Sequence, residues 1–352
     1  MVDTEQKLEE FLATLKQASW VAVDTEADSL HAYPEKVCLI QVSTRFGDRL
    51  VDPLAGLDLG PVLKALSAHE IIMHGADYDL RLLRKHHEFI PAAIFDTMLA
   101  ARLLGVRQFG LSNLTETYLG VKLEKGPQKA NWAMRPLTER MECYARNDTH
   151  YLKPLADCLK QALELKGRLS WHQESCARLI QDSTQERSLD MDLIWRVKGS
   201  HHLGRPGLAI LRELWRWRET EAVAANRPPF FVMSHEKLVE LAAAAANGGA
   251  IGSLLPRHLS ERRRLGLLKA ITRGSDLAAE HHPRILKSMG RRPNEAEKRR
   301  FQELQNKRDA RAAELEIDPT LIASRGTLSE LAHNWEMNSA ALMNWQRELL
   351  KG

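Results

Sequence analysis

The sequence predicts an α/β domain followed by an all-helical region. Over about the first 170 residues, short runs rich in Val, Ile and Leu alternate with segments of helical period, as in folds that mix strands and helices. Beyond them the pattern is almost entirely helical, and one segment is repeated. Because 352 residues is more than one compact core usually holds, we expect two or three domains.

Five short strands are predicted in the first domain. Each is a run of β-branched and aliphatic residues bounded by polar residues, Gly or Pro. They cover residues 19–26, 35–44, 48–54, 70–75 and 92–97. The first three follow one another through short turns, so the sheet begins with hairpin-type connections and differs from a purely βαβ layout.

Helical segments follow the third strand. They are expected at residues 59–69, 77–88, 98–105 and 110–120. A longer periodic segment runs from Leu137 to Gly167 and predicts one or two helices, with Pro154 as the candidate kink. We place this domain at residues 1–175 and a linker or helical connection at residues 176–203.

The helical region contains two copies of one module. Residues 211–242 align without a gap on residues 301–332, and ten of the 32 positions are identical. Such self-similarity indicates two repeated structural units, which we place at residues 204–285 and 290–352.

Each copy of the module has the same expected elements. A first helix leads into an extended loop that contains a proline. Ser234 or Ser324 then provides an N-cap, and a second helix starts near Leu238 or Leu328.

Charge is distributed unevenly along the chain. The net charge is +4, yet residues 1–200 hold 25 Lys and Arg against 28 Asp and Glu. Residues 251–300 hold 13 Lys and Arg against 5 Asp and Glu. This local basic excess fits contact with a polyanion, although a solvated helix face has the same composition.

Neither a membrane span nor a secretory leader is expected. No apolar run approaches the roughly 20 residues that a membrane helix needs, and the N-terminal stretch is acidic and poor in apolar residues. The four cysteines include no CxxC pair, so we predict neither a zinc knuckle nor a disulfide framework. We expect a cytoplasmic protein.

Acidic side chains stand at the ends of several predicted elements. Asp24 and Glu26 end the first strand two positions apart, so both point to the same side of it. Asp79 follows the fourth strand. Tyr144 and Asp148 share one face of a helix because they are four residues apart.

Converging carboxylates indicate a metal site. Like charges brought close together repel unless cations lie among them, and ligands that are all oxygen suit Mg²⁺ or Mn²⁺ better than zinc. Two such ions, about 3.5 to 4 Å apart, form a common arrangement for in-line attack on a phosphodiester.

Three segments that carry these residues resemble the motifs of the DEDD exonuclease superfamily. They are VAVDTEADSL, HGADYDLRLL and YARNDTHYL. The Tyr four residues before the last Asp is typical of the DEDDy branch, and Cys143 stands where the DEDDh branch has a His. With LIQVST, FDTMLAARLLG and NWAMRPLTERMECYARND, residues 18–160 are similar to the ribonuclease D family. The repeated modules resemble helicase-and-RNase-D C-terminal (HRDC) domains, of which that family carries two.

The resemblance implies a fold, a site and a reaction. The fold would be an RNase H-like mixed sheet followed by two all-α HRDC-type domains. Asp24, Glu26, Asp79 and Asp148 would bind two divalent metal ions, Mg²⁺ or Mn²⁺, while Tyr144 orients the attacking water. Nucleoside 5′-monophosphates would leave one at a time from the 3′ end.

Four residues near these motifs need separate consideration. Asp79 is preferred to Asp77 as the second-motif acid, because the following LRLL keeps the helix register of the family. Asp28 and Asp96 fit either a place beside the metal ligands or a helix cap. His74 is expected to make a structural hydrogen bond rather than to bind a metal.

Seven further residues are candidates for contact with RNA. Basic side chains before the third motif and in the basic segment suit phosphates. A Trp in the same loop suits base stacking or a core position equally. The set comprises Lys125, Lys129, Trp132, Arg135, Arg262, Arg263 and Arg264.

The leading functional hypothesis is a 3′→5′ exoribonuclease. Its expected partner is RNA with a single-stranded 3′ end, which in the family's case means tRNA precursors, and we expect a monomer that does not bind membranes. Two alternatives remain: a 3′→5′ DNA exonuclease, and a nucleic-acid-binding protein with an inactive nuclease domain. The complete set of four acids and the Tyr argues against the second.

Overall fold

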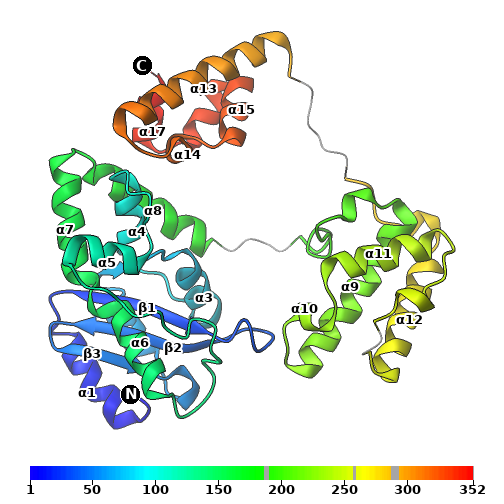
Figure 1. Cartoon of the computed structure of the whole chain (residues 1–352), viewed down its shortest axis with the longest axis horizontal. Helices are drawn as coiled ribbons and strands as arrows, with labels where there is room; N and C mark the ends of the chain where they lie inside the picture. The colour runs from blue at the N-terminus through cyan, green and yellow to red at the C-terminus, as the bar shows by residue number, and fades with distance from the viewer. Residues whose placement is uncertain (186–189, 257–258, 287–292, 352) are drawn as a thin grey trace. The chain divides into compact units, whose positions relative to one another are not determined.

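The computed structural model describes residues 1–185, 190–256, 259–286 and 293–351. The chain forms two compact units (Figure 1). The first comprises Met1–Ala27, Val37–Gln185 and Arg291–Gly352, and the second comprises Asp28–Lys36 and Glu186–Gly290. The expected start of the C-terminal module, residue 290, lies outside the described residues, as do several residues of the basic segment.

A five-stranded mixed sheet forms the centre of the first unit. Its strand order is β3-β2-β1-β4-β5. The strands are β1 (Val21–Ala27), β2 (Val37–Thr44), β3 (Gly47–Val51), β4 (Glu70–Met73) and β5 (Ala93–Asp96). The first three pair antiparallel, whereas β1 with β4 and β4 with β5 are parallel. The predicted mixed α/β fold with its hairpin start is therefore confirmed.

Eight helices within the described part of this domain surround the sheet. They are α1 (Glu5–Leu15), α2 (Gly60–Leu66), α3 (Asp77–His87), α4 (Thr97–Leu103), α5 (Leu111–Leu119), α6 (Glu139–His150), α7 (Leu152–Leu165) and α8 (Leu169–Thr184). Helix α1 adds to the predicted elements, and α8 continues past residue 175. The long predicted segment is two helices that separate at Tyr151. Pro154 lies in the first turn of α7, where its missing N–H removes no intrahelical bond.

Helix α6 crosses β1, β2 and β3 on one face of the sheet (Figure 1). Leu39 of β2 packs there against Met141 and Ala145 of α6. At the other end of the helix, the hydroxyls of Ser43 and Thr149 hydrogen-bond at 2.7 Å. These contacts fix the rotation of α6 about its axis, and with it the direction in which Asp148 points.

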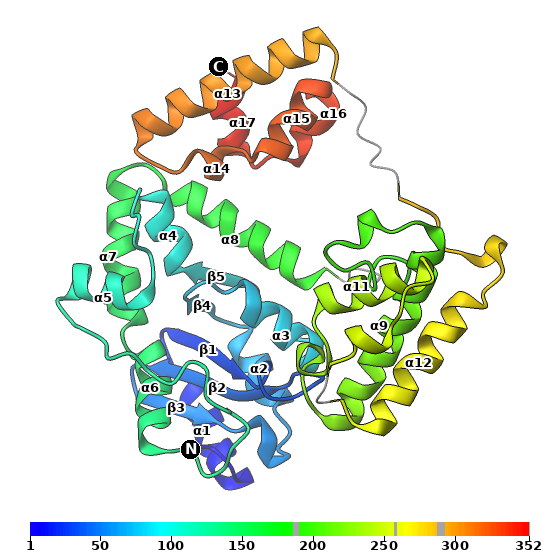
Figure 2. The same cartoon turned by 45° about the vertical axis from the view of Figure 1, so that its right-hand side comes forward.

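The C-terminal helices belong to the first unit. They are α13 (Glu295–Leu315), α14 (Pro319–Ile322), α15 (Arg325–His333), α16 (Trp335–Asn338) and α17 (Asn344–Lys351). Trp345 stacks on Trp171 of α8 with ring centroids 5.0 Å apart. The Arg168 guanidinium donates to the Leu103 carbonyl at 2.7 Å and the Leu315 carbonyl at 2.8 Å. Helix α8 also packs against β5 and α3, so it joins these helices to the sheet domain (Figure 2).

The second unit contains the first repeated module. Its helices are α9 (Arg205–Ala225), α10 (Pro229–Val232), α11 (His235–Ala246) and α12 (Glu261–Ser275). Helices α13, α14 and α15 begin 90 residues after α9, α10 and α11, respectively. Two expectations are wrong in detail: the loops with the proline contain the short helices α10 and α14, and the second helices begin three residues earlier than expected, at His235 and Arg325.

The repeated residues make the same local contacts in both copies. Ser234 accepts a hydrogen bond from the Lys237 backbone N–H, and Ser324 accepts one from Thr327, so both are N-caps. The buried Arg218 donates to the Met233 carbonyl at 3.5 Å, and Arg308 does the same to Ala323 at 3.0 Å.

Candidate active site

Four carboxylates from three elements converge on the sheet face that α6 covers. Asp24 and Glu26 lie on β1, Asp79 in the first turn of α3, and Asp148 on α6. The pKa of Asp24 is raised well above its ordinary value, first by burial and then by the charges of Asp79, Asp148 and Glu26. The structure thus brings together the four acids that the sequence motifs single out.

Burial also raises the pKa values of the other three acids. Burial, followed by repulsion from Asp148 and Asp79, raises the pKa of Glu26 to about 9. Burial raises the pKa of Asp148 to about 7, and a hydrogen bond from Tyr144 opposes the rise. Burial raises the pKa of Asp79 to about 6, although the Thr25 hydroxyl donates a hydrogen bond to its carboxylate. Protons or cations must therefore balance this cluster near neutral pH.

Tyr144 lies beside the cluster and is held from two sides. Its phenol hydrogen-bonds with Asp148, one helical turn later, and with the Gln128 side chain. Burial, and then the charge of Asp148, raise the pKa of Tyr144 above its ordinary value, so the phenol keeps its proton at neutral pH. Gly126 packs on the ring, because a Cβ added there would lie 1.6 Å from Tyr144 Cδ2.

The donor set fits Mg²⁺ or Mn²⁺. All four converging groups are carboxylates, which are the ligands that these hard cations prefer. Among the described residues, no group of three or more His, Cys, Asp or Glu side chains is already arranged so that it could hold a metal ion. The carboxylates would therefore turn about their side-chain torsions when a cation binds.

Two nearby acids have other partners. Asp77 pairs with Arg81 in α3 and accepts a hydrogen bond from Ser183 Oγ at 3.1 Å. Asp28 pairs with Lys36 and also accepts the backbone N–H of that residue at 2.9 Å. Both acids therefore stabilise local structure.

Asp96 organises the turn that precedes Asp79. Its buried carboxylate accepts the backbone N–H groups of Met98 and Leu99 at 2.8 and 2.9 Å, which caps α4. It also accepts those of Gly75 and Ala76, at 3.2 and 2.8 Å. Asp96 therefore acts as a helix cap and also fixes the turn between β4 and α3.

His74 lies in the same turn and makes the expected structural contact. Its Nδ1 atom is 2.9 Å from the Thr97 hydroxyl. That hydroxyl donates in turn to the Met73 carbonyl at 3.1 Å. Burial lowers the pKa of His74.

Two of the expected RNA contacts have structural roles instead. Trp132 is only 1% exposed, so it takes the core position, one of the two that its sequence context allowed. Arg135 is also occupied: its guanidinium donates to both Asp52 oxygens at 2.6 Å and to the Cys38 carbonyl at 2.7 Å. Lys125 and Lys129 are exposed on the loop before α6.

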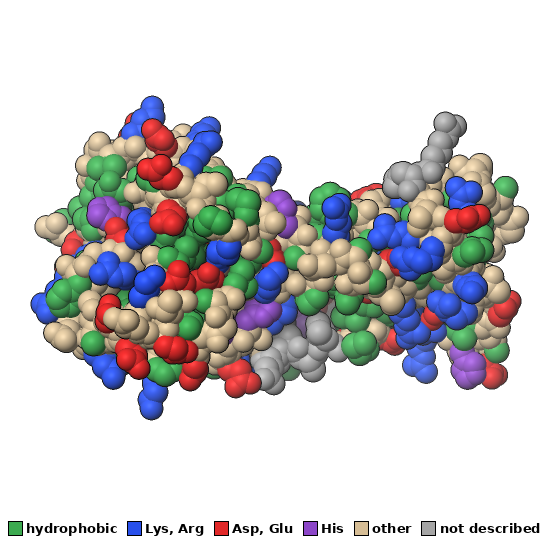
Figure 3. Space-filling view, turned by 90° about the horizontal axis from the view of Figure 1, so that it is seen from below, with side chains coloured by type: hydrophobic (Ala, Val, Ile, Leu, Met, Phe, Trp, Pro, Cys, Tyr) green, Lys and Arg blue, Asp and Glu red, His purple; other side chains and the backbone are tan. Residues whose placement is uncertain are grey.

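The basic residues of α12 lie on the surface of the second unit. Arg262 and Arg263 both pair with Glu221 of α9, yet the Arg262 side chain is still 68% exposed. Arg264 is exposed as well. Lys and Arg side chains gather on this unit at the right of Figure 3. Part of the basic charge is thus neutralised within the protein, and the remainder faces solvent.

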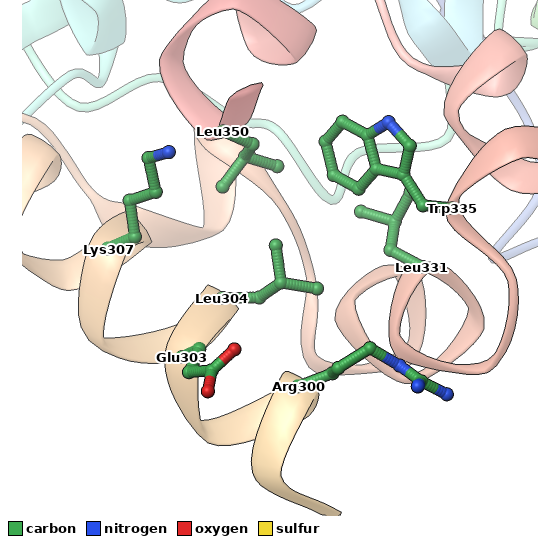
Figure 4. Close-up of a pocket in the computed structure, with 7 residues that line it drawn as sticks. All are labelled: Arg300, Glu303, Leu304, Lys307, Leu331, Trp335 and Leu350. Carbon is green, nitrogen blue, oxygen red and sulfur yellow. The ribbon is translucent and has the colours of Figure 1, made fainter. Parts of the chain in front are cut away.

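A separate pocket of about 240 Å³ lies among the C-terminal helices (Figure 4). Leucine side chains and one indole line it, and its charged residues are of both signs. Its lining residues are Arg300, Glu303, Leu304, Lys307, Leu331, Trp335 and Leu350. None of them belongs to the acid cluster, so this pocket is separate from the candidate active site.

Three residues near the acids escaped the sequence reasoning. Thr25 stands between Asp24 and Glu26, and its hydroxyl binds Asp79. Gly126 and Gln128 lie in a loop whose packing on Tyr144 only the folded chain reveals. The Gly-Pro pair at 126–127 signals a turn but gives no hint of the aromatic ring against it.

Comparison with known proteins defines the class of this chain. A family model described as 3′-5′ exonuclease matches residues 1–164, and a model of the HRDC domain matches residues 207–246. The mixed sheet, the converging acids and these matches define a 3′-5′ exonuclease followed by an HRDC domain. The HRDC match falls on the first of the two repeated modules.

A relative then identifies the family. Ribonuclease D of Gluconacetobacter diazotrophicus is 30% identical over 356 residues, which cover 99% of this chain and 89% of that protein. The chain belongs to the ribonuclease D family and is a 3′→5′ exoribonuclease. Activity in this class of exonuclease depends on divalent metal ions.

Solved structures confirm the fold over the whole chain. RNase D of Escherichia coli, described as an exoribonuclease involved in structured RNA processing, has a TM-score of 0.76 at 23% identity. The match covers 100% of this chain and 98% of that one. A protein from Bifidobacterium adolescentis has a TM-score of 0.84 at 22% identity, over 99% and 94% of the two chains. In the described part of this chain, every helix is too short or too polar to cross a membrane.

Proposed function

We propose that Asp24, Glu26, Asp79 and Asp148 hold two divalent ions, Mg²⁺ or Mn²⁺, at which the 3′-terminal phosphodiester of RNA is hydrolysed. The observation that carries this proposal is the convergence of four carboxylates from β1, α3 and α6; at Asp24 and Glu26, burial raises the pKa first and the neighbouring acids raise it further. Four carboxylates from three elements, one of them buried and three half-buried, are costly to hold together without compensating charge. A catalytic site that binds cations accounts for that cost.

The protein groups around the cluster position the reactants. Tyr144 keeps its proton at neutral pH, so its phenol can donate a hydrogen bond to, or accept one from, the attacking water. Thr25 fixes Asp79, and the contacts between Ser43 and Thr149 fix α6. The bound ions would supply an acidified water and charge stabilisation at the leaving oxygen. Each turnover would release a nucleoside 5′-monophosphate.

We also propose that the helical modules hold the RNA body. The C-terminal helices would be a second HRDC-like domain, since they repeat the first module at a constant offset of 90 residues with the same buried Arg contact. Lys125, Lys129 and Arg264 are exposed and suit phosphates. The domain order would be nuclease at 1–175, connection at 176–203, and modules at 204–285 and 290–352.

The proposal also covers the natural substrate, the oligomeric state and the cellular location of the protein. A single-stranded 3′ end would be needed because the scissile phosphate must reach carboxylates that are buried or half-buried. The RNase D of known structure is described as acting in structured RNA processing. We therefore propose tRNA precursors as the substrate of a cytoplasmic monomer.

A time course on RNA with a 3′ tail and on matched DNA, both labelled at the 5′ end, tests this function. Reactions contain Mg²⁺, Mn²⁺ or EDTA, with wild type, Asp148→Ala, and Asp77→Ala as the matched control. We expect a ladder that shrinks from the 3′ end on RNA and disappears with EDTA or Asp148→Ala, but persists with Asp77→Ala. Equal digestion of DNA would contradict the proposed substrate, and activity in EDTA would contradict the metal site.

A further inference from the structure

Gln41 is a buried amide without a hydrogen-bond partner. It lies in β2, where every residue is buried, and its own side chain is 0% exposed. Neither the amide oxygen nor the amide nitrogen has a partner within the described part of the chain. Buried side-chain amides are nearly always hydrogen-bonded, because water otherwise stabilises them better than the protein interior does. This residue therefore needs an explanation.

The sheet register places Gln41 beside the acid cluster. Gln41 is the direct partner of Asp24 in the antiparallel pairing of β1 and β2. Residues directly opposite one another in such a pair project from the same face of the sheet. Gln41 therefore projects from the face on which Asp24 and Glu26 stand.

The packing of α6 brackets the same position. Leu39, two residues before Gln41, packs against Ala145 of α6. Ser43, two residues after it, hydrogen-bonds with Thr149, the residue that follows Asp148. Since residues 39, 41 and 43 share a face, Gln41 projects from the face of β2 that α6 covers, between two positions whose neighbours are in α6.

A purely structural role does not account for this residue. An apolar side chain of similar shape would fill the same space without any polar atom to satisfy. A position opposite Asp24 on the face that α6 covers, by contrast, offers the amide N–H groups carboxylate acceptors once Asp24 and Asp148 turn toward cations. The amide is also neutral, so it adds no charge to the cluster.

We propose that Gln41 is a positioning residue, whose amide N–H groups donate to Asp24 and Asp148 and orient these carboxylates toward bound divalent ions. The inference rests on the proposed function of the acid cluster. Groups that hydrogen-bond to metal ligands usually change metal affinity by about 10- to 100-fold when they are removed. Gln41 would act in this way without touching the RNA.

The substitution Gln41→Met tests the proposal, because it keeps the length of the side chain and removes the amide. Two effects of opposite sign are expected in the full-length protein. In EDTA, the melting temperature stays equal or rises, because two unsatisfied polar atoms leave the core. The affinity for Mn²⁺, measured without RNA from the electron paramagnetic resonance signal of the free ion, falls at least about tenfold.

Activity provides a second readout. With saturating Mg²⁺, kcat of Gln41→Met should fall while KM for RNA stays within about twofold, since RNA contacts are unchanged. Gln41→Asn keeps the amide but shortens the side chain, and should weaken Mn²⁺ binding in the same direction. Ser324→Ala is the control: it removes the side-chain cap of α15, so it should lower the melting temperature without changing Mn²⁺ affinity.

The outcomes separate this inference from the proposed function. If wild type shows no saturable Mn²⁺ binding, the metal site itself is wrong. If wild type binds Mn²⁺ and Gln41→Met binds it equally well, only the role of Gln41 is refuted. Loss of the fold or a lower melting temperature of Gln41→Met in EDTA would show that the amide has structural partners, which would also overturn the inference.

Discussion

Gly126 should control the position of the Tyr144 phenol. In the structure, a Cβ at residue 126 would lie 1.6 Å from Tyr144 Cδ2 and 2.3 Å from both Cε2 and Cγ. Ordinary van der Waals contact begins at 3.4 Å, so Gly126→Ala must move the ring or the loop by about 2 Å. The backbone of Gly126 does not have the positive φ that would make the substitution strained for another reason.

The size of the effect follows from that displacement. Tyr144 is the phenol that we place against the attacking water, and a misplacement of about 1 Å in a catalytic group can cost about 100-fold in rate. We therefore expect kcat of Gly126→Ala to fall at least about 100-fold, which corresponds to about 2.7 kcal/mol in the activation free energy. Binding of Mn²⁺ should persist, because the four acids are not moved.

Single-turnover hydrolysis of RNA labelled at its 5′ end measures this effect, with unfolding in urea as a check on stability. Gly252→Ala is the control, because an added Cβ at residue 252 meets nothing within 4 Å. Tyr144→Phe provides the reference, since it removes the hydroxyl without moving the ring. Activity of Gly126→Ala within about threefold of wild type would refute the reasoning, by showing that the phenol position does not limit the rate.

Three further predictions concern the buried polar groups. Asp148→Asn should raise the melting temperature in EDTA, because it removes one of the mutually repelling carboxylates, and should abolish the further rise that Mg²⁺ causes in wild type. Asp96→Ala should cost about 3 to 5 kcal/mol of unfolding free energy in urea, since four backbone N–H groups lose their acceptor. Burial lowers the pKa of His172, and Asp96 and Glu70 oppose this effect. As the pH falls, the unfolded chain therefore binds a proton at His172 before the folded chain does. Urea unfolding should therefore show stability falling as the pH drops through about 6.5, and less so in His172→Gln.

The acids were predictable because local periodicity fixes their direction. A spacing of two on a strand places Asp24 and Glu26 on one side, and a spacing of four on a helix places Tyr144 within reach of Asp148. The structure agrees with both, since the charges of Asp24 and Glu26 act on Tyr144 and its phenol bonds with Asp148. These relations need no knowledge of how the elements pack.

The structural roles of Trp132 and Arg135 depend on packing between distant segments. Trp132 and Arg135 lie in a polar loop that gives no sign of burial. The first is covered in a cluster with Leu39 and Met141, and the second is bound to Asp52, 83 residues earlier in the chain. A single sequence does not report such contacts. The sequence does not single out Gln41 for the same reason, because only the strand register places it opposite Asp24.

The two helical modules show what the repeated residues specify. Identical positions such as Leu238 and Leu328, or Arg218 and Arg308, are buried in both copies, and the two Arg side chains donate to equivalent backbone carbonyls. Identity between the copies thus records the internal packing of the module. The surfaces have diverged, since the C-terminal copy and the helix after it bury Trp345 against Trp171 of the nuclease domain.

Because their surfaces differ, the two modules have different roles. The C-terminal helices share a core with α4, α7 and α8, so their removal would expose apolar side chains of the nuclease domain. The first module has its own hydrophobic core and carries the exposed Arg262 and Arg264. One sequence pattern therefore serves two physical purposes: the C-terminal copy stabilises the nuclease domain, and the first copy presents a basic surface suited to RNA.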